Sequence, residues 1–360
     1  MIERNFSQIL LSWYSKHARE LPWRGHPDPY AILVSEMMLQ QTRVETVIPY
    51  FKKWMTIFPS LHDLANSNEQ KVLQVWEGLG YYSRARNLYK TAVMIRGKFD
   101  GKLPQTVTEL ITLPGVGRYT AAAISSIAFG RNEAVLDGNV KRVLARVSNF
   151  TQPVNSPEGE TNLWDLAVEL LPHGKAGAYN QALMDLGATL CTPKSPHCGT
   201  CPVNSLCLAK KMGSQDSLPK MLKKSPIPHI TVCAAIIHRN DKVLVACRPS
   251  KGLLGGLWEF PGGKLEKNES LEQALTREIR EELAAEITIG FFVGKYHHTY
   301  THFKVTLHAF QATIAGNEPS PVEASEIRWV SITDLSNFPM GKIDRSISLD
   351  LQKQILPSIQ

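Results

Sequence analysis

Four cysteines close together in the chain limit its folding more than any other feature. Cys191, Cys198, Cys201 and Cys207 follow the pattern C-x6-C-x2-C-x5-C at the end of a helical stretch. Four thiolates in such a run can close around one metal centre, either tetrahedral zinc or an iron–sulfur cluster, and the spacing leaves both open. Because we find no signal peptide, we expect a reducing cytosol, where disulfides are disfavoured. The run therefore predicts a bound metal.

Length and charge predict a large protein with an anionic partner. With 360 residues, 43% of them hydrophobic, the chain is long enough for two or three cores. No apolar run is long enough for a membrane span, so we expect no membrane association. The formal charge of +7 favours nucleic acid, although an ordinary soluble surface also carries excess lysine. Cys233 and Cys247 lie among apolar residues, and we assign them no chemistry.

Hydrophobic periodicity divides the chain into three parts. Residues 1–207 repeat apolar positions at intervals of three and four, which is typical of helices. Residues 208–229 are rich in lysine and proline, as exposed linkers are. Residues 230–360 predict strands at Thr231–Ile237, Val243–Cys247 and Lys304–Phe310, with one helix near Ser270–Leu283. We therefore expect a multidomain protein: an all-α domain, a linker and an α+β domain.

A glycine-containing turn precedes a helix of small residues. Residues 113–118 read LPGVGR, so Gly115 and Gly117 separate an apolar helix end from the next helix. Backbone amides at such a helix start can hold a phosphate without a lysine. The alternative is an ordinary connection between two helices.

This turn resembles the hairpin of the helix-hairpin-helix DNA glycosylases typified by endonuclease III. In that superfamily a catalytic aspartate follows on the next loop, and the resemblance assigns this role to Asp137. The cysteine run, residues 191–207, lies where the superfamily holds a 4Fe-4S cluster, so the resemblance favours the cluster over zinc. Lys141 could trap the opened sugar incidentally, but its place on the loop beyond Asp137 favours contact with the DNA backbone.

The residue after the hairpin indicates the reaction type. Members that also cut the DNA strand carry a lysine directly after LPGVGR, and its amine forms a Schiff base with the sugar. Tyr119 stands at that position. The resemblance therefore implies a monofunctional enzyme that releases the base by hydrolysis.

Four further motifs narrow the resemblance to the adenine DNA glycosylases. They are LPWR at 21–24, VSEMMLQQT at 34–42, GLGYY at 78–82 and NQALMDLG at 180–187. This similarity spans nearly all of the first 207 residues. It implies a base excision repair enzyme that removes adenine paired with 8-oxoguanine or guanine in double-stranded DNA. We expect a monomer in the cytoplasm, associated with the nucleoid.

Two carboxyl groups in different surroundings suit this chemistry. Adenine leaves after protonation, while the sugar becomes oxocarbenium-like and positive. Glu36 lies among Val34, Met37 and Met38, so we expect burial to raise its pKa, although an exposed surface glutamate is the alternative. The resemblance makes Glu36 the acid and Asp137 the ionised carboxylate that faces the sugar. Tyr119 and Asn139 would orient them.

The target base must leave the duplex before it can react. The family resemblance assigns contacts with the gap and the remaining base to Gln40, Gln41, Thr42, Leu79 and Tyr81. It assigns the adenine pocket to Trp23, Arg24 and Gln181. Tyr81 and Tyr82 could instead be core aromatics after the Gly-Leu-Gly turn, and we favour that interpretation for Tyr82.

The C-terminal part resembles the MutT-like, or Nudix, domain with which this family reads 8-oxoguanine. The loop HTYTH at 298–302 matches the lesion-reading loop, so the resemblance assigns lesion contacts to Thr301 and His302. Residues 263–282 fit the Nudix box G-x5-E-x7-R-E-U-x-E-E. This sequence departs from the Nudix pattern only after that segment, where Ala284 replaces the glycine.

Three carboxylates of this box share one helix face. Glu278, Glu281 and Glu282 are spaced i, i+3 and i+4, which suits Mg²⁺ held against a diphosphate. Hydrolysis of 8-oxo-dGTP is therefore an alternative additional activity, and a solvated charged helix is another. Against hydrolysis, residues 338–342, FPMGK, lack the asparagine that reads the base in MutT-like enzymes.

Other classes fit less well. A zinc nucleobase deaminase needs H-x-E and P-C-x-x-C, and neither occurs. A catalytically silent lesion-binding protein would not need both Glu36 and Asp137. The hypothesis of a stand-alone Nudix hydrolase would not explain residues 1–207.

Overall fold

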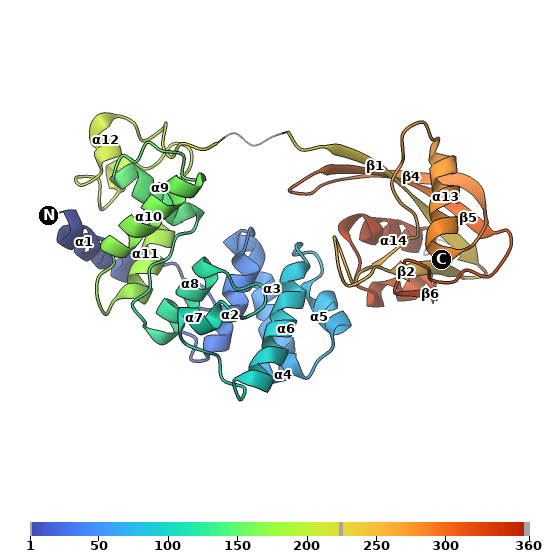
Figure 1. The fold of residues 1–360 in the computed structure, drawn as a ribbon, viewed down its shortest axis with the longest axis horizontal. Helices are drawn as coiled ribbons and strands as arrows, with labels where there is room; N and C mark the ends of the chain where they lie inside the picture. The colour runs from blue at the N-terminus through green and yellow to red at the C-terminus, as the bar shows by residue number, and fades with distance from the viewer. Residues whose placement is uncertain (1, 223–225, 356–360) are drawn as a thin grey trace. The chain divides into compact units, whose positions relative to one another are not determined.

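The computed structural model describes residues 2–222 and 226–355, which fall into two compact units. Unit 1 comprises Met1–Asn66 and Lys90–Lys224, and unit 2 comprises Ser67–Tyr89 and Ser225–Gln360. Figure 1 shows that helices build the former and that all the labelled strands belong to the latter. No helix among the described residues is long and apolar enough to cross a membrane.

The first 207 residues are helical, as predicted. The helices are α1 (Ile2–His17), α2 (Pro29–Leu39), α3 (Val44–Ile57), α4 (Leu61–Ala65), α5 (Glu69–Trp76), α6 (Ser83–Lys98), α7 (Val107–Leu110), α8 (Arg118–Phe129), α9 (Gly138–Val147), α10 (Pro157–Glu169) and α11 (Ala176–Thr189), followed by η1 (Cys198–Thr200) and α12 (Leu208–Met212). Prolines lie between several of these helices because they cannot donate to a helical ladder.

Helix α2 lies in the interior of unit 1. Asp28 caps its N-terminus and Pro29 takes the first turn, where a missing amide hydrogen costs nothing. The helix is apolar on all sides, and its residues from Tyr30 to Met38 are buried. A second core joins α1, α8, α9, α10 and α11 around Val143, Leu144 and Leu183. Any polar residue of α2 is therefore carried into the protein interior.

Unit 2 also contains a mixed sheet. Its strands are β1 (His229–Arg239), β2 (Lys242–Cys247), β3 (Trp258–Glu259), β4 (Ile287–Thr299), β5 (Lys304–Ile314) and β6 (Glu326–Ser331). The order is β3-β2-β1-β5-β4, and β6 pairs with β2. β1 and β5 run parallel, while the other pairs are antiparallel.

Helices cover both faces of this sheet. α13 (Leu271–Leu283) packs on one face through Leu275 and Ile279, and α14 (Lys342–Ile355) packs on the other through Ile343 and Ile347. The predicted strands at β1, β2 and β5 and the predicted helix at α13 are confirmed. The expectation of a single helix is wrong, because α14 follows β6 and the 3-10 helix η2 (Ile332–Asn337). In α14 the apolar residues recur at every fourth position, so they form a narrow stripe that is flanked by charged residues.

Candidate active site

Glu36 is a buried acid on the interior helix α2. Only 5% of the residue is exposed, and Oε2 has no hydrogen-bond partner among the described residues. Burial raises the pKa of Glu36 to about 7, and the negative charge of Asp137 adds to this. A hydrogen bond with Tyr119 acts in the opposite direction. The expected burial is confirmed, and the carboxyl group holds a proton over much of the neutral range.

Asp137 caps the N-terminus of α9. Its carboxylate accepts hydrogen bonds from the Val140 amide at 2.7 Å and from the Asn139 side chain at 3.1 Å. Burial raises the pKa of Asp137, but these hydrogen bonds and the charge of Arg142 oppose the shift. The helix dipole also favours a negative group at this position. The ionised form therefore has support that Glu36 lacks.

Tyr119 lies beside both carboxyl groups. Burial raises the pKa of its phenol well above the usual value, and the charges of Glu36 and Asp137 raise it further. The hydroxyl is thus neutral and able to donate, and it also lies 4.0 Å from the Met184 sulfur. The structure therefore brings together all four residues predicted to be catalytic: Glu36, Tyr119, Asp137 and Asn139.

Arg142 connects this site with the cysteine segment. Its guanidinium donates to Asn139 Oδ1 at 2.8 Å, to the Gly187 carbonyl at 2.8 Å and to the Cys191 carbonyl at 2.7 Å. Gly187 has no room for a side chain, because a Cβ would lie 2.7 Å from Asn139 Cβ. Sequence reasoning missed Arg142, although an arginine on an otherwise apolar helical face is a signal.

The four cysteines of the run line one cavity, and none forms a disulfide. Burial raises the pKa of Cys201 to about 11, and the charges of the other three thiols add to the shift. Four thiolates so close together need positive charge, which an iron–sulfur cluster supplies. Arg146 donates to the Cys191 sulfur at 3.4 Å. The residues thus fit the cluster, although no group of three or more His, Cys, Asp and Glu side chains in the described part of the chain is arranged to hold a metal ion.

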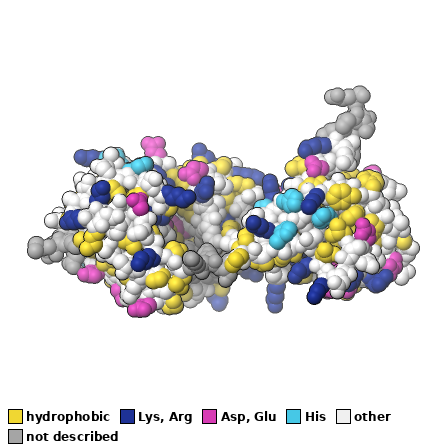
Figure 2. Space-filling view, turned by 90° about the horizontal axis from the view of Figure 1, so that it is seen from above, with side chains coloured by type: hydrophobic (Ala, Val, Ile, Leu, Met, Phe, Trp, Pro, Cys, Tyr) yellow, Lys and Arg dark blue, Asp and Glu magenta, His cyan; other side chains and the backbone are white. Residues whose placement is uncertain are grey.

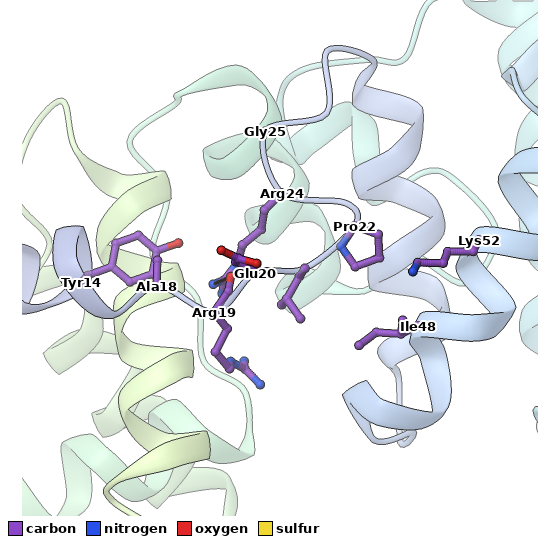
Figure 3. A pocket seen from close by; sticks show the side chains of 10 residues that line it. Tyr14, Ala18, Arg19, Glu20, Pro22, Arg24, Gly25, Ile48 and Lys52 are labelled. Carbon is purple, nitrogen blue, oxygen red and sulfur yellow. Dashed lines mark hydrogen bonds between the residues drawn. The ribbon is translucent and has the colours of Figure 1, made fainter.

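A cavity of about 670 Å³ lies next to Arg24. Figure 3 shows that Arg19, Glu20 and Arg24 of the segment after α1 lie on one side and Ile48 and Lys52 of α3 on the other. Two other residues predicted to line an adenine pocket do not border this cavity. Trp23 is buried with its ring centroid 5.3 Å from that of Phe51, and the Gln181 side chain donates to Gly177 of its own helix at 3.2 Å.

Asp185 binds two arginines that line this cavity, and it was not identified from the sequence. Arg24 binds its two carboxylate oxygens at 2.7 and 2.8 Å, and Arg19 Nε lies 2.6 Å from Oδ1. Burial acts to raise the pKa of Asp185, yet the hydrogen bonds and charges of Arg24 and Arg19 outweigh it and lower the pKa overall. Asp185 lay within a recognised motif, but its burial depends on residues far away in the chain.

The hairpin and the segment after α2 contact each other. The Gln40 amide donates to the Gly115 carbonyl and to the Thr120 hydroxyl, both at 3.2 Å. Gln41 is exposed in a left-handed conformation with φ of 58°. Gly115 has φ of 76°, which favours glycine.

The remaining predicted DNA contacts of the hairpin region differ in exposure. Gly117 precedes α8 in extended conformation, and Thr42 is half-buried. The ammonium group of Lys141 lies 2.9 Å from the Glu160 carboxylate, so it is already paired. These positions leave Gln41 and the hairpin backbone as the more accessible groups.

Within unit 2, two predicted lesion contacts touch. The hydroxyl groups of Tyr81 and Thr301 form a hydrogen bond. Both residues line a cavity of about 580 Å³, as do His302 and the buried Leu79. Tyr82 is buried, and its hydroxyl donates to the Met340 carbonyl at 3.1 Å, in keeping with the core role favoured for it.

The Nudix-box carboxylates are not equivalent. Burial and the charges of Glu259 and Glu278 raise the pKa of Glu282 to about 8. Arg277 pairs with Glu278 at 3.0 Å and with Glu281 at 3.1 Å. The side chain of Glu281 is 54% exposed, whereas that of Glu278 is 15% exposed. Glu278 is thus paired and shielded, while the raised pKa means that Glu282 resists ionisation, which a bound divalent cation would favour.

Three family models match the chain. The HhH-GPD superfamily of base excision DNA repair proteins matches residues 34–166, the iron–sulfur binding domain of endonuclease III matches 191–207, and the NUDIX domain matches 232–349. These matches confirm the expected fold classes in both halves.

Similar proteins support the same grouping. The adenine DNA glycosylase of Homo sapiens is 36% identical over 91% of this chain and 70% of its own length. That of Schizosaccharomyces pombe is 30% identical over 99% and 92%. A thermostable thymine-DNA glycosylase structure superposes with a TM-score of 0.54 and 29% identity, covering 59% of this chain and 97% of that one. A complex of endonuclease III with DNA, at 24% identity and a TM-score of 0.51, covers 58% and 95% and shares the fold.

Proposed function

This chain belongs to the adenine DNA glycosylase family, and we propose that it removes adenine paired with 8-oxoguanine, and with guanine, from double-stranded DNA. The buried Glu36, with an unpartnered carboxyl oxygen and a pKa raised to about 7, is the observation that most supports this proposal. An acid that keeps its proton near neutral pH suits protonation of a leaving purine. In this role the protein acts as a monomer on nucleoid DNA.

The reaction uses the two carboxyl groups in different states. Glu36 gives its proton to a ring nitrogen of adenine, and the bond between the sugar and N9 then breaks with its electrons going to the base. Asp137 faces the positive sugar with its negative charge. Water adds to the sugar and passes a proton to Glu36, which restores the acid. Tyr119 and Asn139 hold the two carboxyl groups in place through their hydrogen bonds.

The lesion is read in the opposite strand by unit 2. The hydroxyl groups of Tyr81 and Thr301 already meet at one cavity, which would place both beside the remaining base. Gln40 and Gln41 contact the gap that the flipped adenine leaves. The iron–sulfur cluster, held by the four cysteines, supports the loop that carries them.

The reaction is monofunctional because the residue directly after the hairpin carries no amine. Tyr119 presents a neutral phenol where strand-cutting relatives have lysine, and Lys141 is paired with Glu160. Borohydride reduction should therefore trap no complex through residue 119, and any complex that the wild-type protein forms with DNA should be lost in Lys141→Gln. A trapped complex that persists in Lys141→Gln would contradict this part of the proposal.

Adenine release from duplexes containing A:8-oxoguanine, A:G and A:C tests the central assignment. Wild-type protein should act most rapidly on A:8-oxoguanine, while Glu36→Gln should lose about 10²-fold or more of the rate, as for a general acid. Full activity of Glu36→Gln, or no adenine release by the wild-type protein, would show the proposal to be wrong.

A second candidate activity is Mg²⁺-dependent hydrolysis of a nucleoside triphosphate such as 8-oxo-dGTP. It is favoured by the crowding of carboxyl groups that raises the pKa of Glu282, because a divalent cation there would relieve the repulsion from Glu259 and Glu278. These groups would hold Mg²⁺, with Glu281 less directly placed because it reaches Arg277 from the solvent side. Pyrophosphate release should disappear in Glu282→Gln and persist in the control Glu266→Gln. Equal rates in wild type and Glu282→Gln would exclude this site as the source.

A further inference from the structure

Three adjacent strands of unit 2 contain basic and titratable residues but no acid. β4, β5 and β1 are neighbours in the sheet, and none contains Asp or Glu. The same strands carry five of the protein's 11 histidines. Positive charge on these strands therefore has no negative partner within them.

The strand register collects five of these residues on one face. Lys295 lies opposite His308, and His229 lies opposite Lys304 in the adjacent pair. His297 lies opposite Thr306. Paired residues of neighbouring strands point to the same side of a sheet. We call His229, Lys295, His297, Lys304 and His308 the histidine–lysine face, and Figure 2 shows histidine side chains gathered beside lysine and arginine on one side of unit 2.

Two histidines of this face share one hydroxyl group. Thr306 is 4% exposed, and its Oγ1 lies 2.8 Å from His229 Nε2 and 2.9 Å from His297 Nδ1. A hydroxyl has one proton, so it donates to one imidazole at most and accepts from the other. Both rings are thus fixed, and each keeps a second nitrogen for another partner.

The surroundings of the face do not neutralise it. Neither Lys295 nor Lys304 forms an ion pair with any described residue. Further along the same side, Cys233 and Ala235 are covered by α13. Glu278, the acid of α13 that acts on Cys233, is paired with Arg277 at 3.0 Å.

The titration of His308 indicates the same excess of positive charge. Burial lowers the pKa of His308, and the charges of Lys295 and His297 lower it further. An anion placed on the face would relieve this repulsion and favour the protonated rings.

We propose that the histidine–lysine face binds the phosphate backbone of duplex DNA next to the lesion. This inference rests on the proposed function, because Thr301 in the loop between β4 and β5 is where we place the reading of 8-oxoguanine. The same hairpin leads directly from that loop to Lys304 and His297. A duplex in contact with the loop meets phosphate-binding groups on both strands of the hairpin.

Binding of an undamaged labelled duplex by the full-length protein, followed by fluorescence anisotropy, tests the lysines. The slope of log Kd against log salt should fall by about 2 in the double variant Lys295→Gln/Lys304→Gln, since each phosphate contact contributes about 0.9. Arg239→Gln is the matched control, because Arg239 lies on β1 but is already paired with Glu318 at 2.8 Å. An unchanged slope in the double variant would overturn the proposal.

The histidines are tested by pH. Wild-type protein should bind the same duplex more tightly at about pH 6 than at about pH 8, because imidazole gains its proton in this range. His229→Gln/His297→Gln should lose a measurable part of this difference. The same pH dependence in variant and wild type would exclude the histidines.

Adenine release at saturating enzyme separates this inference from the proposed function. Wild-type protein and the control Arg239→Gln should release adenine from an A:8-oxoguanine duplex at the same single-turnover rate. If the wild-type protein released no adenine, the proposed function would fail while the salt slope would still decide whether this face binds DNA.

Discussion

Arg24 and Asp185 form a two-point ion pair, with both guanidinium nitrogens within 2.8 Å of the two carboxylate oxygens. The residues are 161 positions apart, and the Asp185 side chain is completely buried. This pair joins the segment before α2 to α11, so it ties the wall of the Arg24 cavity to the helix that carries Met184.

Replacing Asp185 with asparagine should strongly destabilise unit 1. Arg19 and Arg24 would then face a neutral amide, and breaking a buried ion pair from one side costs about 3 kcal/mol or more. Urea unfolding measures the loss. Lys141→Gln is the control, because its partner Glu160 has a side chain that is 48% exposed and such pairs contribute roughly 1 kcal/mol or less. Similar losses in the two variants would contradict the role given to Asp185.

The rate of adenine release should fall as pH rises through about 7. Glu36 has its pKa raised to about 7, so the protonated acid is present below this pH and disappears above it. Single-turnover rates between about pH 5.5 and 9 measure the profile. A rate that stays constant up to about pH 9 would exclude Glu36 as the required acid.

The same pKa predicts a gain of stability when Glu36 is replaced. Its pKa is raised from 4.5 to about 7 on folding, so its favourable contribution is complete below pH 4.5 and is lost as pH rises to 7. At about pH 8 the free energy of unfolding of Glu36→Gln should therefore exceed that of wild type by up to roughly 3 kcal/mol, which raises its melting temperature. At about pH 5 the two melting temperatures should be nearly the same. Equal melting temperatures at both pH values would argue against an ionised, buried Glu36.

Gly187 should not tolerate alanine, because α9 and α11 approach closely at this point. A Cβ would lie 2.7 Å from Asn139 Cβ and would push Asn139 away from Asp137. We expect a loss of about 1–3 kcal/mol in stability and slower adenine release. Gly97→Ala in α6 is the control, since its Cβ meets nothing within 4 Å. A normal rate in Gly187→Ala would show that the position of Asn139 is unimportant.

Loss of one cysteine of the run should remove the cluster. Cys198→Ser should contain less iron, lack the visible absorbance of an iron–sulfur protein and be cleaved more readily within residues 191–207 by added protease. Cys233→Ala is the matched control, because Cys233 is buried in β1 and should not affect iron content. Normal iron in Cys198→Ser would mean that this residue is not a ligand.

The sequence was sufficient for features that depend on local spacing. The cysteine run, the turn with Gly115 and the apolar pattern of α2 each lie within a short segment, so their pattern is visible before folding. Three strands and α13 followed from the same kind of periodicity. The C-terminal helix α14 was missed because charged residues interrupt its narrow apolar stripe.

Only the tertiary structure decided which groups share a site. The raised pKa of Glu36 depends on burial by helices from other parts of the chain and on Asp137, about a hundred residues later. Asp185 is held by arginines from the start of the chain, and Arg142 joins Asn139 to Cys191. Burial and pairing arise when distant segments come together, so the residue types were readable in the sequence but their electrostatic surroundings were not.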